Sequence, residues 1–88
     1  MNYCEKFKAL SDPIRLDILD ELAKGELAAG DIANKFSLSH SKVSYHLSIL
    51  KKVNMVLERK HKNYIYYTLN LKGVEDTMSW FNRFRWLK

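Results

Sequence analysis

Residues 29–52 read AGDIANKFSLSHSKVSYHLSILKK. Apolar residues recur at helical spacing through residues 29–36 and again through residues 40–52, which predicts two short helices. A tight polar turn separates these segments, and Ser39 in that turn is suited to cap the second helix. Two short helices joined by such a turn form a helix-turn-helix.

The second of these helices is predicted to have two unlike sides. Val43, Leu47 and Leu50 share one side at helical spacing, which predicts that this side is buried. The opposite side carries hydroxyls and a lysine, from Ser41, Ser44, Tyr45, Ser48 and Lys52. This polar side is the one expected to meet a partner.

Two further helices are predicted ahead of this unit. Residues 2–10 have the spacing of a short helix. Asp12 and Pro13 predict the start of a second helix over residues 13–24, and Gly25 predicts its end.

After Asn54 the apolar period changes from helical towards alternating. Residues 55–60 and 64–70 are rich in Val, Ile, Tyr and Thr, so they predict a hairpin whose turn, residues 61–63, is basic. Residues 71–88 return to a helical pattern with two apolar rows. The predicted fold is one mostly α-helical domain with a β-hairpin wing, a winged helix-turn-helix.

Composition excludes several classes of protein. The 88 residues make a single domain, and one cysteine excludes a disulfide framework or a zinc site of several cysteines in one chain. No apolar run approaches the ~20 residues of a membrane span, and Glu5, Lys6 and Lys8 lie where a signal peptide would be apolar. We expect a cytoplasmic protein without membrane contact.

The positive charge is concentrated in one segment. The formal charge of the chain is +5, and residues 39–63 alone sum to +5, whereas residues 1–38 sum to −2 and residues 64–88 to +2. A basic block beside an acidic half indicates a face for polyanions. A solvated surface of lysine and arginine would give the same balance.

Fold and charge together favour double-stranded DNA as the partner. In a winged helix, the second helix of the pair enters the major groove and the wing lies along phosphates or the minor groove. Short hydroxyls suit base edges and lysines suit phosphates, while His46 suits a packing or phosphate role better than a metal role. The residues expected to contact DNA are Ser39, His40, Ser41, Lys42, Ser44, Tyr45, His46, Lys51, Lys52, Arg59, Lys60 and Lys62.

Several stretches resemble the ArsR family of bacterial repressors. Residues 7–15, FKALSDPIR, are similar to the family's opening signature, residues 29–33 and 41–50 to its reading unit, and residues 65–69 to its second wing strand. The tail around Trp80 is most similar to the SdpR-like branch. The resemblance implies a homodimeric, operator-binding transcriptional repressor that dimerises through its first and last helices, about residues 2–10 and 72–88.

The customary metal sites of that family are missing from this chain. Metal-sensing members carry a cysteine pair in the segment that matches residues 26–31, where this chain has alanine and glycine. Other members place histidines along the last helix, where this chain has only Glu75 and Asp76. Neither place supplies a converging set of zinc ligands, so we expect neither a metal nor a cofactor.

Two departures from the family pattern concern local geometry. Lys62 replaces the glycine expected at the wing tip, so Asn63 is expected to take the left-handed position. Ala28 lacks the side chain that often caps the third helix, which should cost that helix about 1 kcal/mol.

The terminal helices carry more large apolar side chains than one chain can bury. Self-association is favoured because exposed apolar patches usually indicate a partner surface, and an aromatic ligand pocket is the alternative. Cys4 is interpreted first as a small hydrophobe in this interface and second as a redox switch across the dimer axis. The residues expected at the interface are Tyr3, Cys4, Phe7, Met78, Trp80, Phe81, Phe84 and Leu87.

No catalytic arrangement is recognisable in the sequence. It has no glycine-rich phosphate loop and no nucleophile with an evident base and orienting acid. We therefore expect a non-enzyme. The alternatives to a DNA-binding repressor are a winged helix that binds protein or RNA, and a thiol-responsive regulator that uses Cys4.

Overall fold

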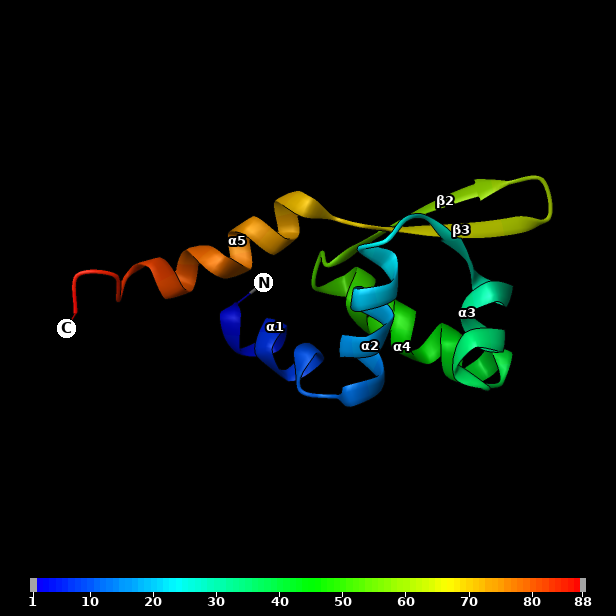
Figure 1. The fold of residues 1–88 in the computed structure, drawn as a ribbon, viewed down its shortest axis with the longest axis horizontal. Coiled ribbons are helices and arrows are strands. Elements are labelled where there is room, and N and C mark those ends of the chain that lie inside the picture. Colours follow the sequence, from blue (N-terminus) through cyan, green and yellow to red (C-terminus); the bar gives the residue numbers. More distant parts are fainter. Residues whose placement is uncertain (1, 88) are drawn as a thin grey trace.

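The computed structural model describes residues 2–87 (Figure 1). The elements follow the order α1 (Tyr3–Leu10), α2 (Pro13–Leu22), β1 (Leu27–Ala28), α3 (Ala29–Phe36), α4 (His40–Lys52), β2 (Val56–His61), β3 (Tyr64–Leu69) and α5 (Leu71–Asn82). Helices α3 and α4 are the predicted helix-turn-helix, and the β2–β3 hairpin is the predicted wing. The winged helix-turn-helix prediction is confirmed.

Polar side chains fix the starts of α2 and α4 as the sequence predicts. Asp12 Oδ1 accepts the backbone N–H of Ile14 at 2.8 Å and of Arg15 at 3.3 Å. Ser39 Oγ accepts the backbone N–H of Lys42 at 3.2 Å. Each bond satisfies amide groups that have no partner within the helix, so both helices begin at a defined residue.

Helix α3 begins without a side-chain cap from Ala28, as predicted. The Asp31 carboxylate reaches back instead and accepts the Ala28 N–H at 3.4 Å. At the other end Ser37 takes the left-handed region, with φ of 53°, and its N–H returns to the last turn of the helix. This reversal leads the chain directly into α4.

The wing belongs to a three-stranded antiparallel sheet with the order β1-β3-β2. Strand β2 pairs with β3 from Val56 opposite Leu69 to His61 opposite Tyr64. The two-residue β1, which the sequence analysis did not predict, pairs with the other edge of β3. Two residues are too short for an alternating pattern to show, so this strand forms only because β3 offers a free edge.

The turn at the wing tip differs from the prediction. Only Lys62 and Asn63 lie between the paired residues His61 and Tyr64, and Lys62 takes the left-handed region with φ of 57°. The expectation that Asn63 would take it was wrong. The favoured two-residue hairpin turns require positive φ at their first central residue, so position in the loop outweighs side-chain preference here.

The core lies between α2, α3, α4 and the inner face of the sheet. Its fully buried side chains are Ile18, Ile32, Val43, Leu47, Leu50 and Val56. Because three of these come from one side of α4, the opposite side of that helix is turned towards solvent, as predicted.

Two helices are shorter than the sequence predicts. Helix α2 ends at Leu22 and not at residue 24, and Gly25 follows with φ of 150°. Helix α5 ends at Asn82, and residues 83–86 form turns, so the expectation of a helix to residue 88 was wrong. The side chains of residues 81–87 are all exposed, so little packing supports a longer helix there. Residue 88 lies outside the described residues.

Helix α5 and the wing project from opposite ends of the body (Figure 1). The molecule is accordingly long, with extents of 49 × 23 × 22 Å. No helix within residues 2–87 combines the length and the apolar character that crossing a membrane requires.

Candidate nucleic-acid interface

The solvent side of α4 presents short polar side chains in a row. Ser41, Ser44 and Tyr45 are exposed, and Tyr45 keeps 61% of its surface accessible. The buried residues on the other side of the helix determine that this row faces solvent, since they turn the apolar side of α4 towards the core. Hydroxyls and a phenol on a rigid helix can donate to base edges and also accept from them.

Eleven of the twelve residues expected at DNA are exposed, and His46 is the exception. His46 is only 6% exposed, and its Nδ1 lies 3.1 Å from the Arg15 Nη1 atom. Its expected contact with DNA is therefore corrected to a packing role. His46 follows the buried Val43 at helical spacing, which was the available signal that it faces inward.

Lys51 and Glu58 connect α4 to the wing. Lys51 Nζ donates to Glu58 Oε1 at 2.8 Å, and the Tyr67 hydroxyl donates to Glu58 Oε2 at 3.2 Å. The hydrogen bond from Lys51 lowers the pKa of Glu58 below its ordinary value. Burial, aided by the Glu58 carboxylate, raises the pKa of Tyr67 to about 12. The carboxylate thus links Lys51 of α4 to Tyr67 of β3.

Arg59 is also held in place before any partner binds. Its guanidinium donates to the Glu26 carboxylate from Nε at 3.2 Å and from Nη2 at 2.8 Å, and it lies 4.7 Å from the centre of the Tyr66 ring. These hydrogen bonds lower the pKa of Glu26. No role of Glu26 is visible in the sequence, because the pairing of β1 with β3 that brings it beside Arg59 joins distant segments.

The other cations of this face are available to an anion. Among residues 2–87, the ion pairs include none from Lys42, Lys52, Lys60 or Lys62. All four side chains are exposed on α4 or at the wing. Free ammonium groups at these places can neutralise phosphates.

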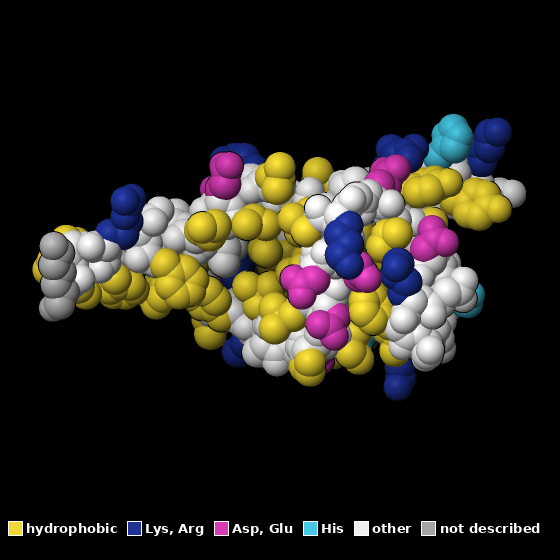
Figure 2. All heavy atoms as spheres, viewed as in Figure 1, with side chains coloured by type: hydrophobic (Ala, Val, Ile, Leu, Met, Phe, Trp, Pro, Cys, Tyr) yellow, Lys and Arg dark blue, Asp and Glu magenta, His cyan; other side chains and the backbone are white. Residues whose placement is uncertain are grey.

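A second surface, on α1 and α5, is apolar. Figure 2 shows hydrophobic atoms along the side of α5 that faces α1. The Trp80 ring lies 5.3 Å from Phe7, 5.1 Å from Phe81 and 5.0 Å from Phe84, measured between ring centres. The Tyr3 hydroxyl is hydrogen-bonded to Ser79 Oγ at 3.0 Å. These contacts bring residues from the two ends of the chain into one aromatic cluster.

Most of the expected interface residues remain uncovered in the single chain. Phe81 is 54% exposed, and Met78, Phe84 and Leu87 are also exposed, the last two beyond the end of α5. A hollow of about 550 Å³ opens beside Trp80 and is lined by Tyr3, Cys4, Phe7, Lys8 and Ser11. Cys4 is an exposed free thiol at its edge.

No three histidine, cysteine, aspartate or glutamate side chains gather as a metal site within residues 2–87. The expectation of no metal stays a prediction.

Comparison with known proteins identifies the family. The family model described as bacterial regulatory protein, arsR family, matches residues 12–57. This chain belongs to the arsR family. The transcriptional repressor SdpR of Bacillus subtilis (strain 168) is 42% identical over 78 residues, which cover 89% of this chain and 87% of SdpR.

Two solved structures share the fold. The structure of reduced HlyU from Vibrio cholerae N16961 has a TM-score of 0.75 and 30% identity, and the match covers 94% of this chain and 87% of HlyU. A possible transcriptional regulator for arsenical resistance has a TM-score of 0.81 and 28% identity, covering 92% of this chain and 83% of that chain. The predicted family is confirmed, and an arsR-family chain is a regulatory protein and not an enzyme.

Proposed function

We propose that this arsR-family chain binds an operator in double-stranded DNA as a homodimer and represses transcription in the cytoplasm. One observation supports DNA binding above the others. The exposed hydroxyl row of α4 lies on the family's helix-turn-helix, beside a wing whose lysines are free of ion pairs among the described residues. Ser41, Ser44 and Tyr45 read base edges, and the lysines bind phosphate.

The apolar α1–α5 face supports the homodimer. An exposed cluster of aromatic side chains on a small chain is unfavourable in water unless another surface covers it. A closed two-fold dimer covers the same patch on both chains and places two reading helices about one DNA turn apart. The operator is then an inverted repeat.

Repression is supported by the relatives. SdpR of Bacillus subtilis is named a transcriptional repressor, and its similarity extends over nearly the whole of both chains.

A fluorescence-anisotropy titration tests this function. The probe is the duplex upstream of the chain's own gene, with a shuffled duplex of equal composition as control, each at two salt concentrations. We expect preference for the native duplex, two chains per site, and affinity that falls steeply with salt. Equal weak binding to both duplexes would contradict an operator at this place. No binding at low salt would contradict DNA as the partner and favour a protein-binding winged helix.

A further inference from the structure

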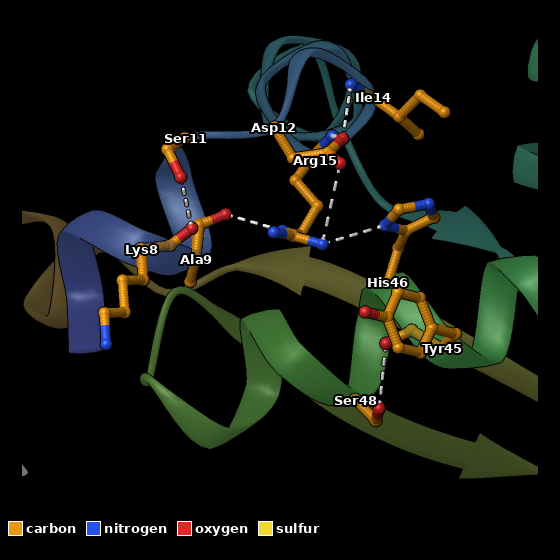
Figure 3. Close-up of polar contacts among 9 residues, drawn as sticks. All are labelled: Lys8, Ala9, Ser11, Asp12, Ile14, Arg15, Tyr45, His46 and Ser48. Carbon is orange, nitrogen blue, oxygen red and sulfur yellow. Dashed lines mark hydrogen bonds and ion pairs between the residues drawn. The ribbon is translucent and has the colours of Figure 1, made fainter.

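We propose that Arg15 and His46 form a positioning pair that sets how well α4 discriminates its operator, although neither residue contacts DNA. The inference rests on the proposed function and extends it to residues behind the reading surface. Figure 3 shows the arrangement, with Arg15 of α2 between the end of α1 and the ring of His46.

The bond between the two side chains is directional. Arg15 Nη1 lies 3.1 Å from His46 Nδ1. A guanidinium has only donors, so Nδ1 must be the acceptor and the neutral imidazole carries its proton on Nε2. Both groups are shielded from water, since His46 is 6% exposed and the Arg15 side chain 11% exposed. Loss of the acceptor would leave a shielded donor without its partner.

Arg15 is itself held by two other contacts, one from α1 and one from the N-cap of its own helix α2. Its Nε donates to the Ala9 carbonyl at 2.6 Å, in the last turn of α1, where that carbonyl has no partner within the helix. Its backbone N–H is bound by Asp12, whose carboxylate lies 3.9 Å from Nη1. Contacts with α1 and α2 therefore hold the guanidinium in one position, and from that position it binds His46 of α4.

The reading row lies directly beside His46 along the helix. Tyr45 is the preceding residue and turns outward, with its ring centre 5.2 Å from that of His46 at 70°. Ser48 Oγ donates to the Tyr45 carbonyl at 2.9 Å. Apolar packing by Val43 and Leu47 is non-directional and permits small rotations of α4. The bond to Arg15 limits that rotation, so it limits where the Tyr45 hydroxyl lies in the groove.

Two substitutions at His46 separate the hydrogen bond from the volume of the ring. His46→Asn keeps an acceptor oxygen near the place of Nδ1, whereas His46→Phe fills the space without an acceptor. Arg15→Met removes the same bond from α2, in case His46→Phe does not fold. Each variant is titrated against the operator duplex and the shuffled duplex, and thermal unfolding and sedimentation are measured on the same samples.

We expect His46→Phe and Arg15→Met to lower the ratio of operator to shuffled affinity about tenfold, the scale of one hydrogen bond to a charged group. The affinity for the shuffled duplex and the salt slope should stay unchanged, because no phosphate contact is lost. His46→Asn should keep the ratio within about twofold of the wild type. The double variant should lose no more of the ratio than Arg15→Met alone, since that substitution already removes the Arg15–His46 bond.

An unchanged ratio in folded, dimeric His46→Phe or Arg15→Met protein would overturn the inference and leave the pair as ordinary packing. So would an equal loss in His46→Asn. Failure of the proposed function looks different, because then the wild type itself would bind both duplexes alike.

Discussion

The wing and the α1–α5 face both expose large side chains, but they hold them by different means. On the wing, Arg59 is bonded twice to Glu26 and stacks on Tyr66. On the α1–α5 face, Phe81 and Trp80 contact other aromatic rings on one side and solvent on the other. The wing is complete in a single chain and ready for a charged partner. The apolar face is complete only when something covers it.

Substitutions on the α1–α5 face should weaken self-association of the chain, whereas substitutions on the wing should not. Phe81→Glu puts a charge into the proposed interface of both chains, so we expect the dimer to weaken by about a hundredfold or more. Sedimentation equilibrium measures this. Leu57→Glu is the matched control, because Leu57 is on the wing and is equally exposed, at 54%. Dimers that persist in Phe81→Glu would place the interface elsewhere.

Gly73 lies in α5 where that helix packs closely against the backbone of Asn54, and its replacement should destabilise the whole domain. A Cβ at Gly73 would collide with the carbonyl of Asn54, which lies between α4 and β2. We expect Gly73→Ala to lower the free energy of unfolding by about 2 kcal/mol, since backbone must move to make room. Chemical denaturation measures the change.

Gly30→Ala is the control for this substitution. Its Cβ would meet nothing within 4 Å, and the residue lies in α3, so alanine should be neutral or add up to about 1 kcal/mol of stability. Equal effects at the two glycines would show that the close approach of α5 to Asn54 is not needed.

The charged region should respond to salt, whereas the apolar region should not. Lys60→Ala and Lys62→Ala should each weaken binding to any duplex alike and reduce the salt slope by about one unit. Lys72→Ala, which removes an equally charged side chain from α5, should leave the slope unchanged. If Lys60→Ala keeps both affinity and slope, the assignment of the wing to DNA is wrong.

The smallest expected effect is the pH dependence that Glu58 gives to stability. Its pKa lies below the ordinary value of 4.5 because Lys51 stabilises the charged form. The stabilisation is therefore present above pH 4.5 and is lost as the pH falls through the lowered pKa. Glu58→Gln should lack this dependence and lose under about 1 kcal/mol near neutral pH. Thermal unfolding of both proteins from about pH 3 to about pH 7, a range that spans the titration of Glu58, measures this pH dependence of stability. Parallel acid profiles would argue against the Lys51–Glu58 bond.

The helical part of the fold could be predicted because its signals are local. Asp12 and Ser39 cap helices at the places where the sequence puts them, and Val43, Leu47 and Leu50 show a buried side without reference to any other segment. These interactions span a few residues, so periodicity and capping preferences are enough to find them.

The parts that could not be predicted depend on segments far apart in the sequence. Strand β1 forms on an edge supplied by β3, and this pairing is what puts Glu26 beside Arg59. The Arg15–His46 bond crosses from α2 to α4. The local signal was that Arg15 in α2 and His46 in α4 each take a position where the helical pattern is apolar. This indicates that both side chains are buried, but it does not indicate that they contact one another.

Because α5 projects from the body with its apolar side uncovered, the proposed dimer would make the number of chains in the cell a regulatory variable. Part of the stability of the proposed dimer comes from mass action, so its midpoint of thermal unfolding rises with protein concentration. While monomers predominate, the concentration of dimer grows as the square of the chain concentration. A modest change in synthesis or degradation then produces a steeper change in operator occupancy. In the proposed dimer, chain concentration alone would therefore make operator occupancy respond steeply, before any effector acts.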